Sequence, residues 1–323
     1  MDTLIKFAEE WKRQSHKEAY DKQVIKEAGP KASANWQELL NNHIGQAPFK
    51  TIAAIHIKKI QNRGGTFPHT VFFGGPGLGK TTLAKLIAKC LGTRFREFIA
   101  EDLKAKKIHE LIEETRYLDI IFIDEIHSID VSAGEILYAA VQDFEYEGRK
   151  IPAFTLIGAT TDAGDVPKPL LDRFPYRYSM QPYSLEELTR IVLFHYPELS
   201  QEEALECSKR SLDTPRVAKN LGMHVDAARG ICSAEEIFNY LGVDDTGLQP
   251  EHCQVLNTLF VHAKPMAFQE LVFRTNIPRT DLLNFYERHL LQRGYVTRTT
   301  RGRIITPEGV DYLKERQDGA HGH

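Results

Sequence analysis

The sequence predicts an α/β fold, in which a P-loop domain with a parallel sheet covered by helices on both faces is followed by two smaller domains. Three observations predict it. A glycine-rich loop joins an apolar run to an amphipathic helix within residues 71–91. Fully apolar runs then alternate with helical patterns as far as Pro182, as in a parallel sheet buried on both faces. After Pro182 the pattern is helical, and two short strand patterns return near the C-terminal end.

The glycine-rich loop is Gly74-Gly75-Pro76-Gly77-Leu78-Gly79-Lys80-Thr81-Thr82, which fits the pattern G-x-x-x-x-G-K-[ST]. Its glycines let backbone N–H groups turn towards phosphate oxygens, where a side chain would clash. We expect Lys80 to reach the β- and γ-phosphates of ATP and the Thr81 hydroxyl to hold Mg²⁺. The alternative is a glycine-rich turn that binds no ligand. The predicted nucleotide-binding residues of the loop are Gly75, Gly77, Leu78, Gly79, Lys80, Thr81 and Thr82.

Apolar runs at 118–123 and 153–159 read as buried strands, and 95–99 as a further strand; the intervening segments 108–115 and 134–143 read as helices. Two carboxylates, Asp124 and Glu125, directly follow the first run. In a P-loop enzyme the first carboxylate of such a pair helps to hold Mg²⁺, and the second can act as a general base on the attacking water.

Three further residues are placed where they could serve the same site. Thr161 follows the run 153–159, so its hydroxyl could bond the γ-phosphate or the attacking water; a strand-end cap is the alternative. Arg173 could reach into a neighbouring subunit's site as an arginine finger, or form a surface salt bridge with Asp172 or another acid. Arg216 opens a helix of the second domain and could contact the γ-phosphate from the lid side.

The bulk composition limits the remaining possibilities. A net charge of -3 means that any nucleic-acid contact must be a local basic patch. The four cysteines are far apart and form no C-x-x-C pair, as expected for reduced thiols. The N-terminus has no apolar leader, and no run is long enough to cross a bilayer. We therefore expect a cytoplasmic protein without a membrane partner.

Seven motifs along the chain together match one known family. They are His43-Ile44-Gly45-Gln46, the P-loop, Asp124 to His127, Glu135 to Tyr138, Phe154 to Thr161, Thr214-Pro215-Arg216 and Thr300-Arg301-Gly302-Arg303. On these motifs the chain resembles the RuvB family of AAA+ ATPases, over about Leu40 to Leu313. The resemblance implies a ring-forming motor, typically a hexamer, that hydrolyses ATP between subunits and moves duplex or four-way-junction DNA in Holliday-junction branch migration during recombination and repair.

The resemblance also implies a role for each site residue. Asp124 and Glu125 are the Walker B pair, with Thr81 and Asp124 on Mg²⁺. Thr161 is sensor 1, Arg173 the finger that acts in trans, and Arg216 sensor 2. The catalytic set is then Lys80, Asp124, Glu125, Thr161, Arg173 and Arg216, and the adenine contacts are His43, Ile44, Tyr183 and Pro215.

The domain prediction is a charged N-terminal arm at 1–33, an AAA+ domain at 34–182, a helical lid at 183–247, a winged helix at 248–316 and a polar tail at 317–323. The arm is either a docking segment or a loosely packed surface helix. Residues 242–247 read as a linker. The wing is predicted to contact the DNA backbone without sequence preference, although a solvated wing used for protein contact is the alternative. The predicted DNA contacts are Arg293, Arg298, Arg301 and Arg303.

Three departures from the family pattern indicate that the chain resembles a divergent member, such as one from a phage or mobile element. The segment between Phe144 and Phe154 is short and polar, whereas the family has a long hairpin there that docks on RuvA, so a RuvA-like partner is doubtful. Trp36-Gln37 replaces the usual Arg-Pro, so one nucleotide contact is lost or replaced by stacking. Gly-Gly-Pro-Gly replaces Gly-Pro-Pro-Gly, and the first 30 residues have no counterpart.

Two other functions stay open from the sequence alone. The first is an AAA+ switch or loader that binds DNA and recruits a partner without moving along the duplex. The second is a plain winged-helix transcription factor, against which the complete ATPase residue set argues.

Overall fold

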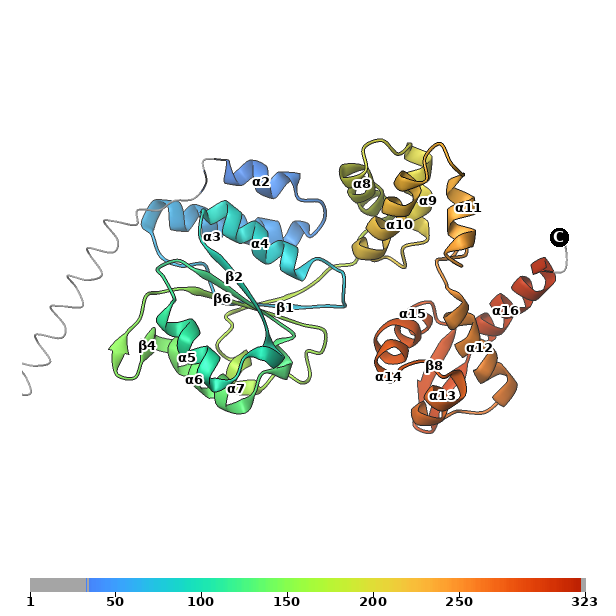
Figure 1. The fold of residues 1–323 in the computed structure, drawn as a ribbon. Coiled ribbons are helices and arrows are strands. Elements are labelled where there is room, and N and C mark those ends of the chain that lie inside the picture. Colours follow the sequence, from blue (N-terminus) through green and yellow to red (C-terminus); the bar gives the residue numbers. More distant parts are fainter. Residues whose placement is uncertain (1–32, 34, 321–323) are drawn as a thin grey trace, which may run out of the picture. The chain divides into compact units, whose positions relative to one another are not determined.

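The computed structural model describes residue 33 and residues 35–320, which fall into two compact units, one up to Tyr183 and one from Ser184 on (Figure 1). The prediction for the N-terminal arm lies outside the described residues, apart from Ser33. None of the helices in the described part of the chain is both long and apolar enough to cross a membrane.

The first unit is built on a five-stranded parallel sheet with strand order β2-β3-β6-β1-β7. The three inner strands, β1, β3 and β6, are short and almost wholly buried, so their alternating side chains reach two separate cores. Phe72 and Phe122 enter one core, while Val71 and Ile121 enter the other. The strands are β1 (Thr70–Phe73), β2 (Phe95–Ile99), β3 (Ile120–Asp124), β6 (Thr155–Thr160) and β7 (Tyr176–Ser179).

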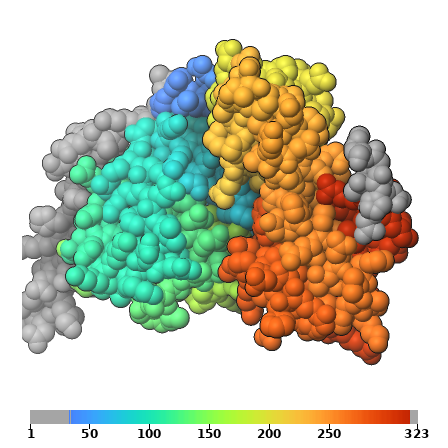
Figure 2. All heavy atoms as spheres, turned by 45° about the vertical axis from the view of Figure 1, so that its right-hand side comes forward, coloured from blue at the N-terminus to red at the C-terminus, as the bar shows by residue number. Residues whose placement is uncertain are grey.

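Helices cover both faces of this sheet, and Figure 2 shows the residues of this unit, teal to green, as one closely packed body. One face carries α2 (Trp36–Asn42), α3 (Ala47–Arg63) and α4 (Lys80–Leu91), whose apolar residues share a core with Phe72. The other face carries α5 (Ala105–Glu113), α6 (Val131–Asp143) and α7 (Lys168–Leu171).

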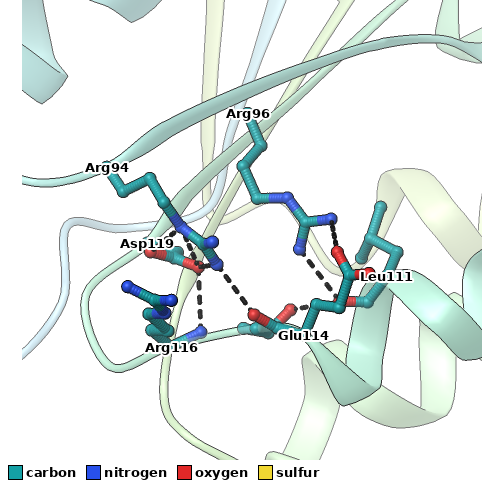
Figure 3. A network of polar contacts seen from close by, with 7 residues as sticks. Arg94, Arg96, Leu111, Glu114, Arg116 and Asp119 are labelled. Carbon is teal, nitrogen blue, oxygen red and sulfur yellow. Dashed lines mark hydrogen bonds and ion pairs between the residues drawn. The ribbon is translucent and has the colours of Figure 1, made fainter.

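An ion-pair network fixes the start of β3 against β2 and α5 (Figure 3). The buried Asp119 carboxylate accepts bonds from Arg94 Nε at 3.0 Å and from the Arg116 N–H at 2.8 Å. Arg94 also donates to the Glu114 carbonyl at 2.7 Å, and Arg96 pairs with the Glu114 carboxylate at 2.8 Å. These bonds hold β3 in register, so its far end delivers Asp124 to a fixed place.

A short hairpin follows α6. Its strands, β4 (Glu145–Tyr146) and β5 (Arg149–Lys150), are joined by a two-residue turn. Its turn residues, Glu147 and Gly148, both have positive φ, as a type I′ turn requires. Tyr146 is buried, with its ring 5.4 Å from that of His109, and Arg149 pairs with Glu113 at 2.7 Å. The hairpin therefore lies on α5.

The second unit begins with four helices, α8 (Leu185–His195), α9 (Gln201–Lys209), α10 (Pro215–Ala227) and α11 (Ala234–Tyr240). Serine residues with a glutamate three residues on form capping boxes at the starts of α8, α9 and α11. The buried Arg210 bonds Glu206 and Glu235, and its guanidinium lies 4.4 Å from the Phe238 ring centroid. These contacts hold α9 and α11 together.

The rest of the unit has the winged-helix order of three helical stretches, a two-stranded wing and a last helix. The third stretch contains one turn of π-helix, Leu282–Tyr286, between α14 and α15. The elements are α12 (Pro250–His262), α13 (Phe268–Thr275), α14 (Arg279–Asp281), α15 (Glu287–Gln292), β8 (Val296–Thr299), β9 (Gly302–Ile305) and α16 (Pro307–Ala320).

The segment predicted as a linker, 242–247, is held by the buried Asp244. One carboxylate oxygen accepts the N–H groups of Thr246 at 2.9 Å and Leu248 at 2.7 Å. The other oxygen accepts a bond from the Tyr312 hydroxyl and pairs with Arg316 at 3.1 Å. Because Tyr312 and Arg316 belong to α16, the segment is fastened to the winged helix.

Candidate active site and nucleic-acid interface

The P-loop lies between β1 and α4, at the carboxyl end of the sheet. Gly77 has φ 78° and Gly79, the residue before α4, has φ 95°, a backbone region that glycine adopts easily. The buried Lys80 donates from Nζ to the carbonyls of Gly74 at 2.7 Å and Gly75 at 3.1 Å. Thr81 and Thr82 then form the first turn of α4, where N–H groups and the helix dipole favour an anion.

The predicted adenine motif meets the P-loop through Tyr183. The Tyr183 hydroxyl donates to the Leu78 carbonyl at 3.2 Å, and a Cβ on Gly45 would lie 2.4 Å from the Tyr183 ring. Gln46 accepts a bond from the Tyr178 hydroxyl at 2.8 Å and donates to the Gln181 carbonyl at 2.8 Å, which ties the start of α3 to the end of β7. The segments around Gly45, Leu78 and Tyr183 are thus in contact within the first unit.

His43 lies at the edge of this cluster, next to Ile44, which is half-buried. Burial and the charge of Lys50 lower the pKa of His43 to about 4, so the ring is neutral near pH 7. Its Nε2 atom is buried and has no hydrogen-bond partner in the described chain. A buried polar atom without a partner, two residues before the contact of Gly45 with Tyr183, fits a ligand that bonds there.

The carboxylates of Asp124 and Glu125 end β3, next to the strand that carries Thr160 and Thr161. Burial raises the pKa of Asp124, whose Oδ1 accepts the Glu125 N–H at 3.0 Å. Glu125 has φ 47°, and its Oε2 accepts both the N–H and the hydroxyl of Thr161 at 3.0 Å. The sequence does not predict this contact between Glu125 and Thr161, because a contact between two strand ends depends on the order of strands in the sheet.

His127 is a member of this site to which we assigned no role from the sequence. Its Nδ1 lies 2.8 Å from the Thr160 hydroxyl and 3.4 Å from Glu125 Oε2. The Gly74 N–H in turn donates to the Thr160 carbonyl at 3.1 Å. The motif Asp124 to His127 holds the only available signal, since it places this histidine just after the strand end that carries the two carboxylates.

Arg173 follows α7 and is half-buried, and its Nε has no hydrogen-bond partner in the described residues. The neighbouring acid, Asp172, pairs instead with Arg177 at 3.4 Å. The salt bridge between Arg173 and Asp172, which was one alternative from the sequence, is therefore absent from the described chain.

Arg216 and Pro215 open α10 in the second unit. Arg216 is exposed, and the two residues Leu212 and Asp213 just before the helix both have positive φ. The contact of Arg216 with the nucleotide stays a prediction, because Arg216 and the P-loop belong to different units.

Trp36 does not offer a surface to a nucleotide. Its side chain is 6% exposed, lies in the core with α4, and donates from Nε1 to Gln61 at 2.9 Å. The idea that stacking on this residue replaces a lost nucleotide contact is wrong, because α2 packs its indole ring inward.

The four arginines predicted to contact DNA differ in their exposure and in their partners within the fold. A buried carboxylate, Glu287, accepts bonds at 2.8 Å from both Arg298 on β8 and Arg303 on β9. Arg293 donates to the Thr246 carbonyl at 3.0 Å. Arg301 is exposed at the turn. Sequence reasoning missed Glu287, which reads as an ordinary exposed residue of a helix.

A phosphate-binding loop, a carboxylate pair and a hydroxyl at the carboxyl edge of one parallel sheet define a P-loop enzyme of the ATP-hydrolysing class, here joined to a winged helix. Two domain families match the chain: "Holliday junction DNA helicase RuvB P-loop domain" over residues 37–180 and "RuvB C-terminal winged helix domain" over residues 245–314.

Relatives that match most of the chain belong to the same family. The chain is 34% identical over 302 residues to the Holliday junction branch migration complex subunit RuvB of Limosilactobacillus reuteri, covering 85% of this chain and 89% of that protein. It is 33% identical to the subunit of the same name from Thermosipho melanesiensis, of which it covers 96%. The Holliday junction branch migration motor RuvB of Thermotoga maritima superposes with a TM-score of 0.77 at 31% identity, over 84% of this chain and 95% of that one. The chain belongs to the RuvB family.

Proposed function

We propose that this protein is an ATP-driven DNA motor of the RuvB type, which hydrolyses ATP at the subunit interfaces of a ring, most simply a hexamer, and moves duplex DNA to drive Holliday-junction branch migration. The observation that carries the proposal is the joining, in one RuvB-family chain, of a complete P-loop site to a winged helix with an exposed Arg301. Such a wing suits sequence-independent contact with phosphates.

In the proposed reaction each residue of the site has a separate role. Lys80 and the P-loop N–H groups bind the phosphates, and Glu125 takes the proton of the attacking water. Thr161, which bonds Glu125 in the structure, orients that carboxylate. Thr81 and Asp124 would hold Mg²⁺, which neutralises charge on the phosphates.

Arg173 is the proposed finger that completes a neighbouring subunit's site, as supported by its guanidinium having no acid partner in the described chain. We expect Arg173→Ala to lower kcat for ATP hydrolysis by about 10³-fold or more, while Arg177→Ala, the matched control, stays near wild type. Mixing Arg173→Ala with Lys80→Ala subunits should restore part of the activity, because some interfaces then hold one intact half from each. Full activity of Arg173→Ala alone would contradict the finger.

The hairpin favours a coupling partner other than a RuvA-like one. Since Tyr146 is buried and Arg149 is paired on α5, the hairpin presents little apolar surface for docking. This leaves an ATP-dependent switch or loader as the second candidate. A four-way-junction assay separates them: ATP-dependent dissociation of the junction supports the motor, whereas tight ATP-dependent binding without dissociation, with or without a RuvA-like protein, supports the switch.

A further inference from the structure

We propose that His127 is a positioning residue for ATP hydrolysis, which holds the Glu125 carboxylate in the orientation that accepts a proton from the attacking water. The inference rests on the proposed function, because it assumes that Glu125 is the general base of an ATPase. Neither phosphate binding nor the proposed metal site accounts for this histidine, whose Nδ1 lies 3.4 Å from Glu125 Oε2.

The chain turns sharply after β3, and the turn brings His127 to the neighbouring strand β6. Glu125 has φ 47°, in the left-handed region, and a short 3₁₀ turn, Ile126–Ser128, follows it. The isoleucine that begins this turn is fully buried against β6, where a Cβ on Gly158 would lie 2.8 Å from the isoleucine Cδ1. The ring of His127 therefore lies next to Thr160, two residues further along β6.

The hydrogen bonds around Thr160 determine which proton faces Glu125. The Thr160 hydroxyl donates to the Asp162 carbonyl at 3.0 Å and accepts the Asp162 N–H at 3.0 Å. Because a hydroxyl has one proton, it must act as the acceptor in its third contact, with His127 Nδ1 at 2.8 Å. The tautomer that satisfies all three contacts carries its proton on Nδ1. The same N–H group faces Glu125 Oε2.

Three donors thus converge on one oxygen of the Glu125 carboxylate. Oε2 accepts the N–H and the hydroxyl of Thr161, both at 3.0 Å, and faces the Nδ1–H of His127. Oε1 accepts no hydrogen bond from the described part of the chain. The donors on Oε2 therefore set the direction of Oε1, which is the oxygen free to take the proton of the attacking water.

The test compares steady-state ATP hydrolysis, and binding of a fluorescent ATP analogue, in variants of the full chain. His127→Ala should lower kcat about 10- to 100-fold, as expected for a misoriented base, and leave KM and analogue affinity within about 2-fold of wild type. His127→Asn should keep kcat within about 3-fold of wild type, because its amide supplies an N–H donor near the position of Nδ1. Ser128→Ala is the matched control, since Ser128 shares the turn and its side chain makes no hydrogen bond within the described residues.

A second pair of variants separates positioning of Glu125 from support of the P-loop. The Gly74 N–H donates to the Thr160 carbonyl at 3.1 Å, so loss of the ring could act through the phosphate site instead. In a Glu125→Gln chain, followed over hours at high protein concentration, adding His127→Ala should change the residual rate by less than about 2-fold, because the group that it positions is gone. An equal loss in both backgrounds, or weaker analogue binding by His127→Ala, would overturn the inference.

The same measurements keep this inference apart from the proposed function. If the variants behave as expected but the wild-type chain does not dissociate a four-way junction, the motor fails and the role of His127 stands. If the motor is active and His127→Ala hydrolyses ATP at the wild-type rate, the inference alone is overturned. A wild-type chain that hydrolyses no ATP, with or without duplex DNA, would contradict both.

Discussion

The Glu287 carboxylate determines how much of the wing's positive charge is available to a ligand. Its carboxylate is 1% exposed and bonds both Arg298 and Arg303, so one of the two arginine charges is cancelled within the fold. A buried carboxylate without such partners would be strongly unfavourable. The four arginines predicted to contact DNA are therefore not equivalent, and Arg301 is exposed and makes no ion pair within the described residues.

His69 makes the stability of the first unit depend on pH. Its Nδ1 accepts the Leu156 N–H at 2.9 Å, and burial lowers its pKa from 6.5 to about 4. The unfolded chain therefore binds a proton more readily than the folded one. The stabilisation is complete above pH 6.5 and is lost as the pH falls towards 4, by about 3 kcal/mol at most.

We expect His69→Asn, which keeps an acceptor for the Leu156 N–H and cannot titrate, to lose less stability than wild type between pH 7 and pH 4.5. Urea unfolding followed by tryptophan fluorescence checks this, because Trp36 is buried in the first unit. Equal losses in the two proteins would show that His69 is not the group responsible.

At the scale of elements, the wing depends on a close approach at Gly302. This residue has φ 135°, and a Cβ there would lie 2.1 Å from the Met266 carbonyl oxygen. Met266 and Arg303 exchange two backbone hydrogen bonds of 2.8 Å at the same point. The wing strand β9 is thereby attached to the segment before α13.

Gly302→Ala should therefore detach the wing, at a cost of about 1–3 kcal/mol from backbone strain alone. Amide hydrogen exchange would show faster exchange at Met266 and Arg303, and duplex binding should weaken. Gly294→Ala is the matched control: its φ is also positive, at 73°, but an added Cβ meets nothing within 4 Å. Unchanged protection at Met266 in Gly302→Ala would count against the attachment.

Regular elements follow from local pattern, and the sequence predicts most of them. The strands at 95–99 and near 120 and 155 are confirmed, as are the helical pattern after Pro182 and the two strands near the C-terminal end. The edge strand β7 (Tyr176–Ser179) was missed, because its exposed and buried residues alternate and it carries Arg177. An edge strand of a parallel sheet lacks the continuous apolar run that identifies the inner ones.

The site could be predicted only in part. Motif spacing is enough to select Lys80, Asp124 and Glu125, because the P-loop pattern fixes the lysine and the two carboxylates follow directly after an apolar run. The bonds between Glu125 and Thr161, and between Glu287 and the wing, join segments whose proximity depends on tertiary structure. Likewise, glycine content made 242–247 look like a free linker, whereas the buried Asp244 holds it.

At the scale of the whole second unit, Asp244 fastens the segment that follows α11 to the winged helix. Asp244→Ala removes the acceptor for the Thr246 and Leu248 N–H groups and leaves Arg316 without its partner. We expect amide exchange at Thr246 and Leu248 to quicken about 10- to 100-fold, as local opening becomes easier by about 1–3 kcal/mol. The adjacent exposed Asp245→Ala is the control, and equal exchange in both variants would contradict the role of Asp244.

The contacts of Asp244 also determine where the chain can be cut and rejoined. A chimera that takes its winged helix from a relative, joined after Gly247, would separate Asp244 from its native partners Tyr312 and Arg316. A junction before Gly242 would carry the carboxylate and both partners across together. The N-terminal boundary of a winged-helix domain that can be transferred as a unit therefore lies before Gly242.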